Sequence, residues 1–263
     1  MSARSVRGLV RRHYYLHKSS WPRVLDLIYW PVMNLFLWGF LAVYLERMGP
    51  RLPQVVPMLL GALLLWDVLF RSQLGVALSF LEEVWSRNLV NLFVSPITLF
   101  EFMSAQLIVA ILRTAVAVGT MAVLAILLYH FNFFSLGLPL VGFFANLMIM
   151  GWAIGLFVSG LILRFGQGAE NLAWAIIFLF QPISAVFYPV GALPGWLQPI
   201  SWATPAANVF EGMREVIAHG RFDSGLFLRA LWLNLLYLAA GAGAFLLMFR
   251  QARRDGLLLQ IGE

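Results

Sequence analysis

Three charged residues lie deep within the apolar runs of this 263-residue chain, and they are the first candidates for chemistry. Asp67 and Arg71 are four residues apart in one run, and Arg113 lies in the next. On a helix, this spacing with the acid first places carboxylate and guanidinium side by side. Charges inside a bilayer are costly and by default indicate a functional site. We expect an intramembrane polar cluster, acting either as an ion pair that joins two spans or as a substrate contact or gating element.

Other arrangements that could support catalysis or metal binding are incomplete. His13 and His17 have a spacing that can hold zinc, but no Glu lies between them and their neighbours are basic, so we expect contact with the surface or lipid headgroups. Ser159 lies in VSGL and not in a G-x-S-x-G turn, and no His falls inside an apolar run. We find no carboxylate pair suited to acid–base work. The sequence therefore predicts neither a catalytic centre nor a metal site.

Nucleotide hydrolysis is not expected of this chain. A P-loop needs G-x-x-x-x-G-K-[ST], because glycine amides cradle the phosphates and the lysine reaches them. The only lysine, Lys18, lies in HYYLHKSS with no glycine before it. With 0 Cys, the chain also has no cysteine-ligated metal or cluster. We predict that the chain binds no cofactor of its own.

The elements that must position these residues are membrane-spanning helices. Hydrophobic residues make up 61% of the chain and charged residues 11%, where a soluble domain has about 25% charged residues. A bilayer span needs about 20 mostly apolar residues. The predicted fold is an all-α polytopic membrane protein, with one transmembrane domain over 24–263. Its six predicted spans are 24–45, 55–81, 102–129, 138–163, 172–190 and 225–249.

The charge distribution predicts the orientation. With the N-terminus inside, the inner segments carry eleven Arg and Lys residues and the outer segments four, which favours both termini in the cytoplasm. The net charge of +6 is placed at the ends of apolar runs and not on one soluble face, so it indicates membrane topology and not nucleic-acid binding.

Two cytoplasmic segments have a helical pattern without being spans. Residues 1–23 place apolar positions between basic ones and predict an amphipathic helix along the membrane interface, near lipid headgroups. In the loop after the second span, residues 84–94 repeat apolar side chains at helical spacing, and Pro96 ends the pattern. Such a short helix either docks a partner protein or packs on the membrane surface.

Small residues and prolines mark two further features. Gly151, Gly155 and Ser159 form a small-xxx-small face, as do Ala239 and Gly243, and both predict close helix packing within the chain or between two copies. Residues 191–216 contain three prolines and two tryptophans. They predict short helices that dip into the outer leaflet, where protein or water covers the broken backbone.

In its order of parts the whole chain resembles the membrane permease subunit of ABC transporters of the type-2 exporter family. A basic N-terminal helix precedes six spans, and the loop after the second span runs from Glu82-Glu83 to Ser95-Pro96. The most specific match is 187–214, which includes Phe187, Tyr188, Pro189, Pro194, Trp196, Pro205, Glu211 and Arg214. The resemblance implies that the region 191–216 forms re-entrant helices near the exit of a transport path.

The resemblance also implies partners and roles. Two permease copies would pair, and two P-loop ATP-binding subunits carrying ATP and magnesium would dock below them. The N-terminal helix, with Arg7, Arg11 and Arg12, would be the connecting helix. Residues 84–94 would be the coupling helix, and the contacts with the ATPase would come from Glu82, Glu83, Trp85, Arg87, Asn88, Leu89, Leu92, Phe93, Ser95 and Pro96. The implied function is export of a drug, lipid or polysaccharide across a bacterial inner membrane.

Two other classes remain open from the residues alone. An ion-coupled secondary transporter often has inverted repeats with broken helices in both halves, whereas this chain has a broken region only after 172–190. A polytopic lipid-modifying enzyme would need His or carboxylate clusters at one depth, and we find none. A P-loop ATPase gene beside this one would favour the permease.

Overall fold

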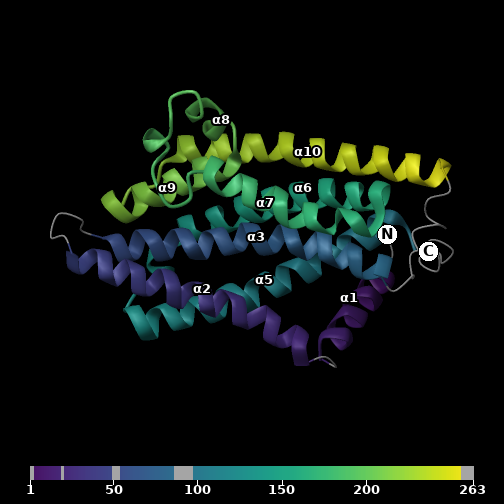
Figure 1. Cartoon of the computed structure of the whole chain (residues 1–263), viewed down its shortest axis with the longest axis horizontal. Coiled ribbons are helices and arrows are strands. Elements are labelled where there is room, and N and C mark those ends of the chain that lie inside the picture. Colours follow the sequence, from purple (N-terminus) through teal and green to yellow (C-terminus); the bar gives the residue numbers. More distant parts are fainter. Residues whose placement is uncertain (1–2, 19–20, 49–53, 86–96, 256–263) are drawn as a thin grey trace.

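The computed structural model describes residues 3–18, 21–48, 54–85 and 97–255. All regular elements in these residues are helices, and Figure 1 shows them as one elongated bundle. In chain order they are α1 (Ala3–Lys18), α2 (Trp21–Met48), α3 (Val55–Trp85), α5 (Leu99–Tyr129), η1 (Phe133–Leu136), α6 (Leu138–Phe165), η2 (Gly166–Ala169), α7 (Glu170–Ile183), η3 (Val190–Ala192), α8 (Gln198–Trp202), α9 (Pro205–His219) and α10 (Ser224–Arg254).

Five of these helices are long and apolar enough to cross a bilayer, counting only the described residues. The crossing stretches are Ile28–Met48, Val55–Glu82, Phe100–Tyr129, Leu138–Phe165 and Ser224–Arg254. The shortest has 21 residues, which span about 30 Å at 1.5 Å per residue. The prediction of an all-helical, multi-pass membrane protein is confirmed.

The predicted span over 172–190 needs correction. Its helix, α7, has 14 residues and a length of about 21 Å, shorter than the hydrocarbon core of a bilayer. Pro182 near its end lacks an N–H, and Ala185 has a left-handed φ of 50° that cannot continue the helix. The apolar composition of 172–190 concealed this break, because hydropathy does not report backbone direction.

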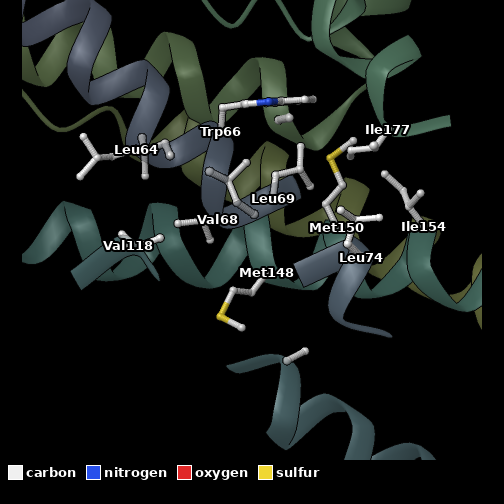
Figure 2. Packing of buried hydrophobic residues seen from close by; sticks show 14 of the residues in the cluster. Leu64, Trp66, Val68, Leu69, Leu74, Val118, Met148, Met150, Ile154 and Ile177 are labelled. Atoms are coloured by element: carbon white, nitrogen blue, oxygen red, sulfur yellow. The ribbon is translucent and has the colours of Figure 1, made fainter. Parts of the chain in front are cut away.

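The centre of the bundle is the contact between α3 and α6. A Cβ added at Gly151 would lie 2.6 Å from the Cβ of Ser72, and one at Gly155 would lie 2.8 Å from the Cβ of Val76. The two glycines therefore let α6 approach α3 closely, as their small-xxx-small pattern predicted. Figure 2 shows larger side chains filling the space around this contact, with Leu69 and Leu74 of α3 near Met150 of α6.

Helix α10 packs on the other side of α6 through a different residue from the one expected. A Cβ at Gly241 would overlap the carbonyl oxygen of Ala153, whereas nothing lies within 4 Å of the Cβ position of Gly243. Ala239 is exposed. The predicted Ala239–Gly243 face is thus not the packing face within this chain, and Gly241 takes that role.

The order of contacts gives the helix directions. Asn146, Ala153 and Gly160 of α6 meet Asn234, Gly241 and Phe245 of α10 in the same order, so the two helices run parallel. The Ser72–Gly151 and Val76–Gly155 contacts show that α3 is parallel to them. Helix α5 is antiparallel to α3, since Gly75 meets Ala110 and Phe80 meets Phe102.

We name the two ends of the bundle by the helices found there. The α1 end is where α3 ends and α5 begins, and α1 packs there mainly against α5. The α9 end, on the left in Figure 1, is where α3 and α6 begin and where α9 packs against α6 and α10.

Adding a single methyl group by a glycine-to-alanine substitution tests the α6–α10 contact. We expect Gly241→Ala to destabilise the protein by about 1–3 kcal/mol, because the new methyl group has no room against the Ala153 backbone. Gly243→Ala is the matched control on the same helix, and we expect no loss and up to about 1 kcal/mol of gain from helix propensity. Thermal unfolding in detergent measures both. Equal melting temperatures for the two variants would contradict this packing.

Candidate functional site

At the α1 end, three helices are joined by one carboxylate. Glu82 of α3 has its Oε2 3.8 Å from Nδ1 of His13 on α1 and 3.6 Å from Nη2 of Arg113 on α5. The side chains of His13 and Arg113 are 3% and 15% exposed, so both pairs are shielded from water. The Arg113–Glu82 ion pair therefore interacts more strongly than an ion pair on the surface would. We name His13, Glu82 and Arg113 the α1-end triad.

The position of His13 corrects the expectation of a surface or headgroup contact. His13 is 2% exposed. It lies one helical turn after the buried Leu9 and on the same side as Val6, which is half-buried. The i, i+3 and i+7 spacing of Val6, Leu9 and His13 on the apolar face of 1–23 was the signal that could have found it. Among the described residues, no group of three or more His, Cys, Asp or Glu could hold a metal ion.

The expected cluster of Asp67, Arg71 and Arg113 is divided into separate pairs. Arg71 Nε donates to Asp67 Oδ2 at 2.6 Å, within helix α3. Arg113 instead meets Glu82, which lies fifteen residues after Asp67 on the same helix, or about 22 Å away. No arginine side chain reaches both positions. The depth count placed the backbone correctly, because Gly75 meets Ala110 and Arg113 therefore lies near the level of Ser72. The Arg113 side chain, however, extends toward the start of α5 and meets Glu82.

A cluster of aromatic rings lies at the depth of the Asp67–Arg71 pair. The ring of Phe70 on α3 is 6.5 Å from that of Trp66, 5.9 Å from Trp174 and 5.6 Å from Phe178, measured between centroids. The last two belong to α7 and are 40% and 50% exposed. Gln73 of α3 also donates to the carbonyl of Ala173 at 3.2 Å. Helix α7 is therefore held on α3 by rings and by one buried hydrogen bond.

At the α9 end, two charged side chains of α9 hold the loop that follows α7. Glu211 Oε1 accepts from the N–H of Val190 at 2.6 Å, and Oε2 accepts from Arg214 Nε at 3.2 Å. Arg214 also donates from Nη2 to the carbonyl of Ala185 at 2.9 Å and from Nη1 to that of Val186 at 3.2 Å. We name Glu211 and Arg214 the loop clamp, since together they satisfy three backbone groups that no helix satisfies.

Local sequence explains why the clamp can form. Thr204 caps α9 by accepting from the N–H of Ala207, and Pro205 follows at the first helical position, where its missing N–H costs nothing. Asn208 donates to the carbonyls of Trp202 and Thr204, which binds the start of α9 to the turn before it. The first two turns of α9 are buried, so its later residues are held in a fixed position.

The other residues that the sequence predicted to lie near the exit of the transport path are found along this loop. The ring of Phe187 stacks on Trp38 of α2, with centroids 4.4 Å apart, and the Tyr188 hydroxyl donates to the carbonyl of Pro182 at 2.9 Å. Pro189 precedes the short helix η3 and is exposed, as are Pro194 and Trp196. The structure thus gathers the exit candidates at the α9 end. Whether they line an exit stays a prediction.

Only three of the coupling candidates belong to the part of the chain that the structure describes. Glu82 is a member of the α1-end triad, and Glu83 and Trp85 lie in the last turn of α3. Outside the described residues lie Arg87, Asn88, Leu89, Leu92, Phe93, Ser95 and Pro96, with most of the predicted coupling helix 84–94. In the connecting-helix candidate α1, Arg7 and Arg11 are exposed and Arg12 is half-buried.

One polar contact between helices was missed by the sequence reasoning. Asn234 of α10 donates from Nδ2 to both the carbonyl and Oδ1 of Asn146 on α6, at 2.9 and 2.8 Å. Both residues are at most 2% exposed. Asn146 in the apolar run FFANLMIM was the available signal, because a buried amide in a membrane span needs a partner on a neighbouring helix.

A comparison with known protein families matches most of this chain. The family model described as ABC-2 type transporter matches residues 10–218, which run from α1 to α9. A search of curated proteins finds no match.

Proposed function

Because the chain belongs to the ABC-2 type transporter family, we propose that it is the permease subunit of an ATP-driven exporter in a bacterial inner membrane. The observation that supports this most is the extent of the match, since residues 10–218 include the second half of α1, the loop clamp and the helices between them. In the family, the permease is the transport component and hydrolysis belongs to a partner. The absence of a P-loop from the sequence agrees with that division.

We place both termini in the cytoplasm, with six crossings. Helices α6 and α10 run parallel, so the chain between them must return along the bundle before α10 begins. Helix α7 runs antiparallel to α3, since Gln73 meets Ala173 while the earlier Phe70 meets the later Phe178. Helix α7 and the clamped loop therefore supply the sixth crossing, with a helix too short to span alone. The α1 end is then cytoplasmic, in agreement with the distribution of Arg and Lys.

Transport would take place between two copies of this chain. We assign the path to the faces of α3 and α7, which carry exposed aromatic side chains such as Phe178 at the depth of the charged pair. Such walls suit an amphipathic or lipid-linked cargo. The exit would be the loop clamp region, where Phe187 bridges to α2.

Coupling would proceed through residues 84–94. This stretch begins in the last turn of α3, within one turn of Glu82 of the α1-end triad. A movement imposed there by two ATPase subunits, each holding ATP and magnesium, would reach α1 and α5 through that carboxylate. The proposed role of the triad is to make these three helices move together.

The class is tested by purification from native membranes in mild detergent, followed by mass spectrometry of the proteins that accompany the chain. We expect a P-loop ATPase in about equal amount. A chain that purifies alone, even after crosslinking, would count against an ATP-driven permease and would favour an ion-coupled carrier.

A charged substitution tests the coupling segment. We expect Phe93→Asp to abolish transport while ATP hydrolysis and membrane insertion persist, because the apolar stripe of 84–94 would no longer seat on the ATPase. Phe165→Asp is the matched control, since Phe165 is 59% exposed at the same end of the bundle. Normal transport by the Phe93 variant would remove the coupling role from this segment.

A further inference from the structure

The guanidinium of Arg71 is oriented by one hydrogen bond in the described part of the chain. Its Nε donates to Asp67 Oδ2 at 2.6 Å. Among the described residues, neither Nη atom of Arg71 has a hydrogen-bond or ion-pair partner, and the side chain is 13% exposed. Arg71 lies sixteen residues after the start of α3 and fourteen before its end, or about 24 Å and 21 Å from the two ends. The Nη edge of the fork, which recognises carboxylates and phosphates in a bidentate manner, therefore lies at mid-depth without a partner in the described part of the chain.

A purely structural role does not account for this pair. Asp67 and Arg71 belong to the same helix, so the pair joins no two elements, unlike the α1-end triad. An i,i+4 pair stabilises a helix only slightly. Placing charged groups at the bilayer centre costs several times more than such a pair contributes, even when the groups are paired. A pair that is costly and that joins no two elements of the described residues is explained by a ligand that it binds.

The neighbouring surface is suited to the apolar part of such a ligand. Phe70 precedes Arg71 in the chain, and its ring contacts Trp174 and Phe178 of α7, whose rings are 40% and 50% exposed. A guanidinium beside half-exposed rings offers a charged contact and an apolar contact at one depth. This combination matches a molecule with an anionic group on a hydrophobic body.

We propose that Arg71 is the anion-binding residue of the transport path and that Asp67 is its positioning residue. The ligand class is an amphiphile bearing a phosphate or carboxylate, held by the Nη edge of Arg71 with its apolar part on Phe70, Trp174 and Phe178. Asp67 orients the fork through Nε. This inference rests on the proposed transport function and names the chemistry of its cargo.

The test measures binding of dodecyl phosphate to the full chain in nanodiscs of neutral lipid, and needs no ATPase. We expect the wild type to bind it, and Arg71→Gln to weaken binding about tenfold or more, the loss for a hydrogen-bonded charge. Arg71→Lys keeps the charge without the planar fork and should fall between the two. Arg164→Gln, on an exposed arginine at the α1 end of α6, is the matched control and should bind as the wild type does.

Two competitors test which part of the ligand is recognised. A measurement of pairing between permease copies separates ligand binding from contact with a second copy. Inorganic phosphate and dodecyl maltoside should each compete poorly, because each lacks one half of the ligand. Equal binding by Arg71→Gln and the wild type would overturn the proposal, and equal affinity for inorganic phosphate would overturn the assignment to an amphiphile. A loss of permease pairing in Arg71→Gln, with binding unchanged, would show instead that Arg71 contacts a second copy. If the ATPase partner is found but dodecyl phosphate does not bind, the transport function stands and this inference fails.

Discussion

Replacing Arg214 with methionine is expected to open the loop of residues 184–190 and to abolish transport. Methionine retains much of the side-chain volume but donates no hydrogen bond. The carbonyls of Ala185 and Val186 would then lose their donors, and Glu211 would lose its charged partner. Each buried group left unpaired costs about 1–3 kcal/mol, so the combined loss reaches about 3 kcal/mol or more.

The absence of cysteine from the chain makes this loss measurable at one position. Val190 is 1% exposed, and a Val190→Cys substitution places the only thiol of the protein beside the loop clamp. We expect maleimide labelling of this thiol to accelerate about tenfold or more when Arg214→Met is added, because local opening exposes it. Arg221→Met, at an exposed arginine just after α9, is the control and should leave the rate unchanged. An unchanged labelling rate in the Arg214 variant would mean that the clamp does not hold the loop.

Replacing Glu82 with leucine is expected to cost about 3 kcal/mol of stability, since it removes the carboxylate that Arg113 and His13 share. Most of this cost would come from leaving the Arg113 guanidinium in poorly hydrated surroundings without that counter-charge. The melting temperature in detergent should fall accordingly. Glu46→Leu is the matched control, because Glu46 is exposed on α2 and its loss should change stability little.

A double substitution separates the ion pair from simple packing. Glu82→Leu with Arg113→Leu replaces both charges by apolar groups, and we expect it to recover much of the stability lost in the single variant. If the double variant is as unstable as the sum of the two single ones, the pair contributes no specific coupling. The same variants, assayed for transport, test whether the triad makes α1, α3 and α5 move together.

Several sequence predictions depended on local composition and were confirmed. The five long apolar helices follow from runs of about 20 or more apolar residues, because backbone groups inside a bilayer must bond within a helix. A helix covers residues 3–18 of the N-terminal segment, whose role at the membrane interface stays a prediction. The contacts of Gly151 and Gly155 follow from their four-residue spacing. Family membership follows from the order of these parts and from the match over 10–218.

Only the tertiary structure determined which side chains of neighbouring helices contact one another. Periodicity determines which face a residue occupies, but the register between two helices depends on where small residues let them approach. Gly75 against Ala110 sets the backbone of Arg113 near the level of Ser72 on α3. The direction of the Arg113 side chain, toward the start of α5, then gives it to Glu82 and leaves Arg71 to Asp67. Likewise, the end of α7 at Ile183 depends on Arg214, twenty-nine residues beyond Ala185, to donate to the loop carbonyls that a longer helix would have satisfied internally. Local sequence determined the helices of this protein, and long-range contacts between charged and small residues determined its candidate sites.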